Sequence, residues 1–265
     1  MPRFAANLTM LFSEHPFSER IRRAAHAGFE AVEILVPYDE DIDRIEADLE
    51  RYAVELVNFN LPLGNVSAGD RGFANDPRRV REFEAGVTNA LDLAERLNCK
   101  RVNCIAGLML PDVPVHDQWE TLKRNLSYAA EKAGERGVRQ LVEPLNTFDN
   151  PGYIICSPHR AFSLIEEVGH PNLMVEYDLY HAQRMEGNLS ATIRDHIGQI
   201  GHVQIADNPG RHEPGTGEIN FPFVFRVLDE AGYDGWVSLE YKPSGATEDS
   251  LSWMLSQGSI RGTGR

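Results

Sequence analysis

Leu141-Val142-Glu143-Pro144 is a short apolar run that ends in a carboxylate and is followed at once by a proline. Three later apolar runs also end in an oxygen-bearing side chain, at Asp178, Gln204 and Glu240. The gaps between these four residues are 35, 26 and 36 positions, about one strand–loop–helix unit each. We therefore expect consecutive parallel strands to deliver one oxygen ligand each to a common face.

Short apolar segments alternate with longer amphipathic ones along the whole chain. Residues 31–36 form a nearly unbroken apolar run, which is typical of a parallel strand covered on both faces. Eight such repeats without a linker predict a single (β/α)₈ TIM barrel over residues 1–256, with residues 257–265 as a disordered tail. A doubly wound open sheet is the alternative, but no G-x-G-x-x-G follows the first strand. The predicted strands are residues 3–8, 30–36, 53–60, 100–106, 139–145, 173–178, 201–206 and 236–241.

Helix boundaries are indicated by capping residues. Asp76-Pro77 and Ser157-Pro158 each place a capping side chain before a proline, which is favoured at the first helical position. Gly134 and Gly169 are expected at helix ends, where a left-handed residue leads into the next strand.

Composition narrows the classes of partner. The formal net charge is −14, which argues against binding to a nucleic-acid backbone or to anionic lipid. Three cysteines without a C-x-x-C spacing are expected to be reduced thiols. The first residues are too few and too polar for a signal peptide, and no apolar run approaches the roughly 20 residues that span a bilayer. We therefore expect a cytoplasmic protein, and the sequence leaves open whether it forms a homo-oligomer.

Residues at the carboxyl ends of barrel strands converge on one mouth, where the chemistry of this fold takes place. Any one of the four strand-end residues could simply cap the next helix or pair with a surface lysine. Their recurrence favours a shared site, because acids so close together repel one another unless a cation compensates. Three carboxylates and one amide suit a hard divalent cation.

The sequence resembles the hydroxypyruvate isomerase family, one of the xylose-isomerase-like barrels, which also include sugar epimerases and endonuclease IV. The similarity covers nearly the whole chain, and its motifs are specific only in combination. They are Arg3-Phe4-Ala5-Ala6-Asn7-Leu8-Thr9-Met10-Leu11-Phe12, Pro37-Tyr38-Asp39, Leu141-Val142-Glu143-Pro144-Leu145-Asn146, Tyr177-Asp178-Leu179-Tyr180-His181-Ala182-Gln183-Arg184-Met185-Glu186-Gly187, Gln204-Ile205-Ala206-Asp207-Asn208-Pro209, Glu213-Pro214-Gly215-Thr216-Gly217-Glu218-Ile219-Asn220 and Glu240-Tyr241-Lys242-Pro243.

This resemblance implies that Glu143, Asp178, Gln204 and Glu240 bind a divalent ion. It also implies that Glu143 and Glu240 act as the proton donor and acceptor. Many members of the wider superfamily have histidine in place of Gln204. A neutral, hard amide oxygen disfavours zinc and favours Mg²⁺ or Mn²⁺. No organic cofactor is expected.

The implied reaction interconverts hydroxypyruvate and 2-hydroxy-3-oxopropanoate by proton transfer through a cis-enediolate. Three carboxylates and one dication leave a net charge of −1, so the carboxylate of this small anionic substrate needs a cationic partner. Lys242 and Arg211 are both candidates. His181 lies three residues after Asp178, a spacing shared with related epimerases, and is expected to donate to a substrate oxygen. Glu33 is expected either to line the substrate side or to form a hydrogen bond inside the barrel.

Other functions fit the same scaffold. A 2-oxo-tetronate isomerase or a ketose 3-epimerase would use the same site on a longer substrate. A metal-dependent DNA repair endonuclease would need several zinc ions, many more histidine ligands and a basic groove. A non-catalytic binding protein would have no need to keep both glutamates.

Overall fold

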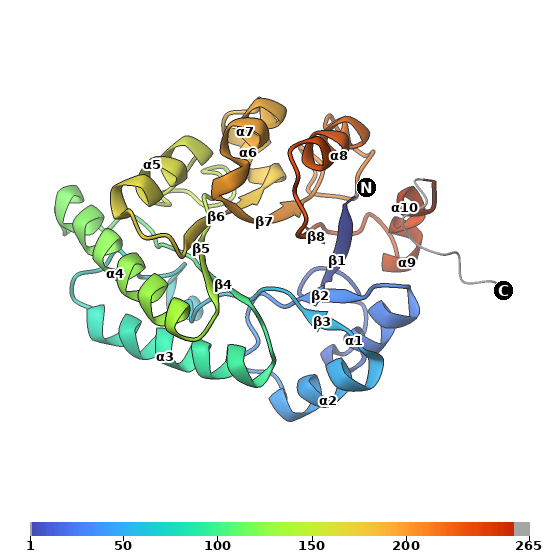
Figure 1. Ribbon diagram of the computed structural model, residues 1–265, viewed down its shortest axis with the longest axis horizontal. Coiled ribbons are helices and arrows are strands. Elements are labelled where there is room, and N and C mark those ends of the chain that lie inside the picture. Colours follow the sequence, from blue (N-terminus) through green and yellow to red (C-terminus); the bar gives the residue numbers. More distant parts are fainter. Residues whose placement is uncertain (1, 257–265) are drawn as a thin grey trace.

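The computed structural model describes residues 2–256, so the predicted tail lies outside the described residues. Eight strands alternate with helices along the chain, and all eight belong to one sheet (Figure 1). The strands are β1 (Arg3–Asn7), β2 (Ala31–Glu33), β3 (Glu55–Leu56), β4 (Arg101–Cys104), β5 (Arg139–Val142), β6 (Leu173–Asp178), β7 (Ile200–Ile205) and β8 (Trp236–Leu239).

Helices follow the strands and surround them (Figure 1). None of the helices between residues 2 and 256 has both the length and the apolar character needed to cross a bilayer. The helices are α1 (Phe17–His26), α2 (Ile42–Tyr52), α3 (Val80–Arg96), α4 (Val115–Glu135), α5 (Pro158–Val168), α6 (Leu179–Met185), α7 (Leu189–His196), α8 (Phe221–Glu230), α9 (Thr247–Ser250) and α10 (Ser252–Ser256), with 3₁₀ turns η1 (Val66–Ala68) and η2 (Ile197–Gln199).

The sheet curls into a closed ring. Its strand order is β3-β2-β1-β8-β7-β6-β5-β4, and every pair of neighbours is parallel. The two end strands meet through a parallel bridge between Asn60 and Asn103. There the Leu61 N–H donates to the Asn103 carbonyl at 2.7 Å, and the Asn103 N–H donates to the Phe59 carbonyl at 2.9 Å. The predicted TIM barrel is confirmed.

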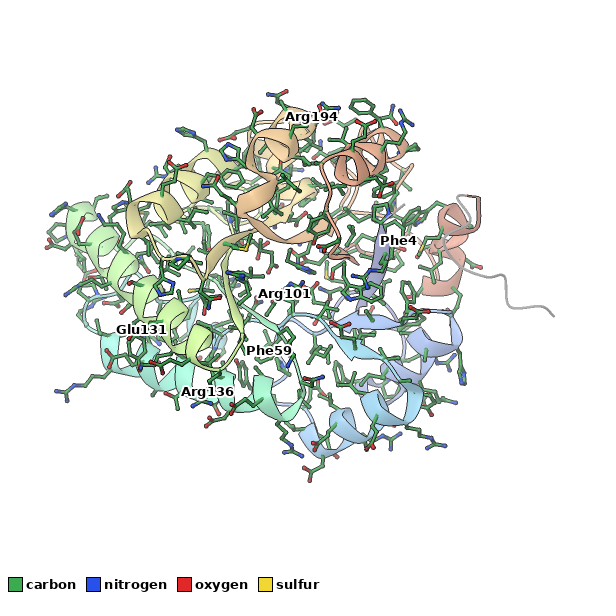
Figure 2. The ribbon with its side chains drawn as sticks, viewed as in Figure 1. Phe4, Phe59, Arg101, Glu131, Arg136 and Arg194 are labelled. Atoms are coloured by element: carbon green, nitrogen blue, oxygen red, sulfur yellow. The ribbon has the colours of Figure 1, made fainter. Side chains whose placement is uncertain are left out.

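The apolar core lies between the strands and the surrounding helices. On α3 the buried side chains recur at three- and four-residue steps, as at Phe83, Val87 and Leu91, so one stripe of the helix packs inward. Figure 2 shows Arg194 on the outer layer, whereas Phe59 is fully buried and packs against Tyr38 in the apolar layer. Polar side chains lie inside the barrel and position the site, as where Asn58 Nδ2 donates to Glu176 Oε2.

Candidate active site

The four strand-end residues come together in one buried group at the carboxyl ends of the strands. Glu143 directly follows β5, Asp178 ends β6, Gln204 is the next-to-last residue of β7, and Glu240 directly follows β8. No more than 5% of any of these residues is exposed. In the sheet, Asp178 pairs directly with Gln204, after a register shift between Val175 and Glu176 on β6.

One oxygen of Asp178 caps a helix, and the other is left for the site. Its Oδ1 accepts a hydrogen bond from the Tyr180 N–H at 2.8 Å, at the start of α6. A helix-capping role for this acid is therefore real, but it accounts for only one of the two oxygens. Oδ2 is buried and has no hydrogen-bond partner among the described residues.

The amide of Gln204 is oriented by a buried carboxylate inside the barrel. Its Nε2 donates to Glu33 Oε1 at 2.6 Å, and only the amide nitrogen can donate to a carboxylate. This contact turns Gln204 Oε1 away from Glu33, and Oε1 is likewise buried without a partner in the described chain. The other oxygen of Glu33 lies 3.0 Å from His202 Nε2, so the interior hydrogen bond expected for Glu33 is present.

Glu143 and Glu240 have carboxyl groups that resist ionisation. Burial is the largest cause in both, and it raises the pKa of Glu240 to about 8 against the opposing charge of Arg211. For Glu143, burial and then the charges of Glu240 and Asp178 raise the pKa well above its usual value. Burial also raises the pKa of Asp178 to about 6. The three acids therefore lie close enough to repel one another when ionised.

His181 is held as a neutral hydrogen-bond donor. Its Nδ1 accepts from the Asn146 backbone N–H at 3.0 Å, and a backbone N–H can only donate. The proton of the neutral ring is therefore on Nε2, which lies 3.5 Å from Asp178 Oδ2 and 4.0 Å from Glu143 Oε1. Burial, followed by the charge of Arg211, lowers the pKa of His181 well below its usual value.

The proton on Nε2 determines whether His181 can bind a metal ion or donate a hydrogen bond. Glu143, Asp178 and His181 offer potential ligand atoms within 4.8 Å of one another, which would also suit a metal ion. An Nε2 that carries a proton has no free lone pair for an ion, whereas it can donate to a substrate oxygen. The oxygens of Glu143 and Asp178 could therefore hold a cation, whereas the ring of His181 could not in this tautomer.

Arg211 lies inside the acidic group, and Lys242 does not. Arg211 Nη2 is 2.7 Å from Glu240 Oε1 and 3.7 Å from Asp178 Oδ2, and its guanidinium lies over the ring of Tyr180 with the centroid at 5.1 Å. The Lys242 side chain is exposed, and only its backbone contacts this region, with its N–H donating to the Arg211 carbonyl at 2.8 Å. Of the two cations expected at the substrate, the structure brings only Arg211 into the group.

The loop that carries Arg211 is built around the carboxylate of Asp207, a residue that sequence reasoning did not single out. Asp207 Oδ1 accepts from the N–H groups of Asn208 and Ile219 at 2.9 and 3.1 Å, and Oδ2 accepts from those of Gly215 and Gly217 at 2.9 and 2.8 Å. A side chain at position 217 would collide with this arrangement, because its Cβ would lie 2.0 Å from the Asn208 carbonyl oxygen. The Gly-x-Gly spacing therefore serves the loop around Asp207.

A second polar layer lies deeper in the barrel and was also missed. Glu176 is fully buried, and its Oε2 accepts from Asn58 Nδ2 at 2.7 Å. Asn103 Nδ2 donates to Glu143 Oε2 at 3.1 Å and to Asn60 Oδ1 at 2.9 Å. Glu176 precedes Asp178 by two positions, so strand alternation places both on the inner face. That spacing is the signal that could have identified Glu176.

The donor set of the four strand-end residues fits a hard divalent cation. Asp178 Oδ2, Gln204 Oε1 and Glu240 Oε2 are buried oxygens with no hydrogen-bond partner within residues 2–256. A buried polar atom without a partner is costly, and an oxygen-binding ion is a group that satisfies such atoms.

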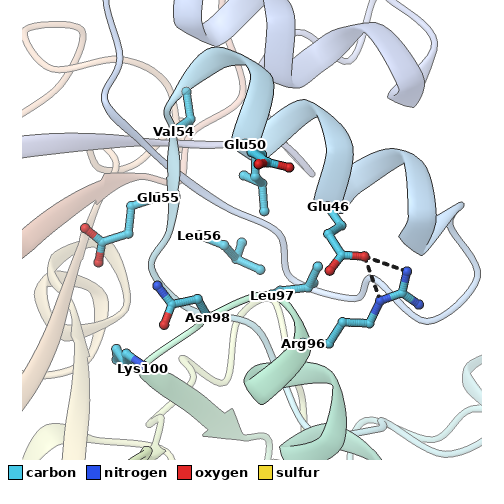
Figure 3. Close-up of a pocket in the computed structure, with 10 residues that line it drawn as sticks. Glu46, Glu50, Val54, Glu55, Leu56, Arg96, Leu97, Asn98 and Lys100 are labelled. Atoms are coloured by element: carbon cyan, nitrogen blue, oxygen red, sulfur yellow. Dashed lines mark hydrogen bonds and ion pairs between the residues drawn. The ribbon is translucent and has the colours of Figure 1, made fainter.

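A separate pocket of about 680 Å³ lies at the opposite end of the barrel (Figure 3). It is lined by residues that precede β3 and β4, among them Val54 and Lys100, and by the Glu46–Arg96 ion pair. The amino-terminal end of this fold is associated with stability, whereas chemistry takes place at the carboxyl ends of the strands. The buried group around Glu143 and Glu240 is therefore the candidate active site.

Comparison with known proteins agrees with this geometry. Residues 21–257 match the family model described as xylose isomerase-like TIM barrel. The chain is 44% identical to the hydroxypyruvate isomerase of Escherichia coli (strain K12), covering 96% of this chain and 98% of that protein. It is 41% identical to the 2-oxo-tetronate isomerase of Pectobacterium atrosepticum, covering 96% and 97%.

Among solved structures, the chain is similar to one described as an AP endonuclease, family 2, from Brucella melitensis. The TM-score is 0.94 at 45% identity, and the match covers 97% of this chain and 99% of that one. Several relatives at 41–44% identity are named as isomerases. The chain therefore belongs to the xylose isomerase-like TIM barrel family and is an isomerase.

Proposed function

We propose that this protein interconverts hydroxypyruvate and 2-hydroxy-3-oxopropanoate with the help of a divalent ion. The observation that carries the proposal is the convergence of two buried glutamates, Glu143 and Glu240, with oxygens of Asp178 and Gln204 that have no hydrogen-bond partner among the described residues. The relatives named as hydroxypyruvate isomerase support this choice of substrate.

Moving the carbonyl of hydroxypyruvate by one carbon requires a proton to leave carbon 3 and another to arrive at carbon 2, while the hydroxyl proton passes from the oxygen on carbon 3 to the oxygen on carbon 2. Between these two events the substrate is a cis-enediolate, with negative charge shared by two oxygens. In our proposal one of Glu143 and Glu240 removes the first proton and the other supplies the second. Burial raises the pKa of both carboxyl groups in the chain without an ion, which favours the protonated form that the acid of the pair needs in order to donate.

Two further side chains would hold the substrate. The Nε2–H of His181 is positioned to donate to a substrate oxygen, and burial keeps the ring neutral. Arg211 is the cation available for the substrate carboxylate, because its guanidinium already lies beside Glu240.

Glu143, Asp178, Gln204 and Glu240 would hold the divalent ion, which when bound supplies a Lewis acid to offset the charge of the enediolate. A neutral amide among the ligands favours Mg²⁺ or Mn²⁺ over zinc.

The test is turnover of hydroxypyruvate by purified protein before and after chelation, with Mg²⁺, Mn²⁺ and Zn²⁺ added back separately. We expect chelation to abolish turnover and Mg²⁺ or Mn²⁺ to restore it. Glu143→Gln and Glu240→Gln should each lower kcat by about a hundredfold or more. Glu186→Gln, which changes an exposed glutamate at the end of α6, is the matched control. Full turnover by either active-site variant would refute the proposed roles.

Two other functions can be tested alongside. The relatives named 2-oxo-tetronate isomerase favour a four-carbon substrate as the second candidate, so the same preparations should be assayed with a 2-oxo-tetronate and with a ketose. Activity confined to the longer substrates would replace our choice.

The similarity to a structure described as an AP endonuclease makes nuclease activity another function to test. The net charge of −14 and the protonated Nε2 of His181 argue against a multi-zinc nuclease, and cleavage of abasic DNA would test this.

A further inference from the structure

Arg211 is a largely buried cation in contact with two of the proposed metal ligands. Its Nη2 lies 2.7 Å from Glu240 Oε1 and 3.7 Å from Asp178 Oδ2, and 19% of the side chain is exposed. Among the described residues it is the only lysine or arginine in ion-pair contact with the four strand-end residues. Its charge therefore offsets part of the repulsion within the acidic group.

The backbone of Arg211 is fixed, so only its side chain can change partners. The residue has a φ of +56°, a left-handed conformation that residues other than glycine rarely adopt. Its N–H donates to the Asp207 carbonyl and its own carbonyl accepts from the Lys242 N–H, both at 2.8 Å. The carboxylate of Asp207 is in turn held by four backbone N–H groups. A new partner must therefore be reached by rotation about the side-chain bonds.

We propose that Arg211 is a placeholder cation that neutralises the ligand carboxylates until a divalent ion binds. Arg211 holds Glu240 Oε1 and approaches Asp178 Oδ2, and the ion would bind the same two carboxylates. Two cations this close repel each other strongly, because burial leaves little solvent to screen them. The arriving ion therefore releases the guanidinium from Glu240, and the released guanidinium becomes available to the carboxylate of the substrate. This inference rests on the proposed function and adds an order of events, in which the ion binds before the oxo-acid.

The first test compares Arg211→Met with the wild-type chain and uses no substrate. Without the guanidinium, the chelator-treated variant should unfold at a lower temperature than the wild type, since its carboxylates lose their compensating charge. Its affinity for Mn²⁺, measured by titration calorimetry, should rise about tenfold or more, since the competing cation is gone. Unchanged or weaker Mn²⁺ binding by this variant would overturn the inference.

Arg184→Met is the matched control. Arg184 is another arginine near the mouth, but its guanidinium lies over the rings of Phe148 and Tyr180, and its Nη1 donates to the Pro209 carbonyl. This variant should bind Mn²⁺ as the wild type does, and tenfold tighter binding by it would also overturn the inference. If neither the wild type nor Arg211→Met binds Mn²⁺, the proposed function and the placeholder role both fail. If both bind it equally well, only the placeholder role fails.

A second measurement needs no destabilised variant. Nitrogen-15 NMR of the wild-type arginine side chains, with the Arg211 signal identified by its loss in Arg211→Lys, reports on the guanidinium directly. Addition of saturating Mg²⁺ should shift the Arg211 resonances and speed rotation of its guanidinium, because the contact with Glu240 is broken. Resonances that do not respond to saturating Mg²⁺ would contradict the release step.

Discussion

Replacement of Asp207 by asparagine should destabilise the protein far more than a change of one atom suggests. The two oxygens of Asp207 accept four backbone N–H groups, and the residue is 1% exposed. In Asp207→Asn an NH₂ group replaces one oxygen, so two N–H donors lose their acceptor whichever way the amide turns. At about 1.5–3 kcal/mol for each hydrogen bond to a charged group, the loss is about 3–6 kcal/mol.

Urea unfolding of the metal-free chain measures this loss, with Asp195→Asn as the control because Asp195 is exposed on α7. Turnover should fall as well, since the same loop holds the backbone of Arg211. A loss of stability below about 1 kcal/mol would show that the loop does not depend on these hydrogen bonds, and our account of how Arg211 is positioned would be wrong.

Three further predictions concern protonation and packing. In the folded chain the pKa of Asp178 is about 6 and that of Glu240 about 8, above the ordinary values of 3.8 and 4.5. Between these values the folded, chelated protein binds more protons than the unfolded chain does. The stability that these two groups contribute should therefore fall as the pH rises toward 8. Urea unfolding at pH 5.5 and 8.5 checks this, and saturating Mg²⁺ should reduce the fall. Asn146→Asp should place an acceptor beside His181 Nδ1 and raise the pKa of the ring, which NMR titration would detect, whereas an unchanged ring pKa would count against the assigned tautomer. Gly217→Ala should lower the melting temperature, since its Cβ would meet backbone at 2.0 Å, and an unchanged melting temperature would mean that the loop adapts.

The barrel could be predicted because the apolar runs of its strands are local in sequence and recur along the chain. Every observed strand lies within or overlaps its predicted segment, and α5 begins at Ser157-Pro158 as expected, although the Ser157 side chain makes no capping hydrogen bond. The start expected at Asp76-Pro77 was wrong, because Asp76 instead binds the backbone and guanidinium of Arg78, and α3 begins at Val80. Gly134 lies within α4 and does not end it. At Asp76 a local contact replaced the expected cap, and after α4 the left-handed glycine is Gly137.

The site could be predicted only in part, because some of its residues are brought together by contacts between distant parts of the sequence. Strand-end positions repeat along the chain, which pointed to Glu143, Asp178, Gln204 and Glu240. The choice between Arg211 and Lys242 depended on a left-handed backbone at Arg211. This conformation cannot be predicted from the sequence at a residue other than glycine. The contacts of Glu176 and Asn58 join residues 118 positions apart, so they appear only once the barrel has closed.

The central claim is that four strand ends hold one divalent ion. Crystals grown with Mn²⁺ and measured for anomalous scattering test it directly. We predict a single strong peak within about 2.0–2.3 Å of oxygens from Glu143, Asp178, Gln204 and Glu240. Absence of a peak there, or a peak only at the exposed group of Glu14, His15 and Glu248, would contradict the account.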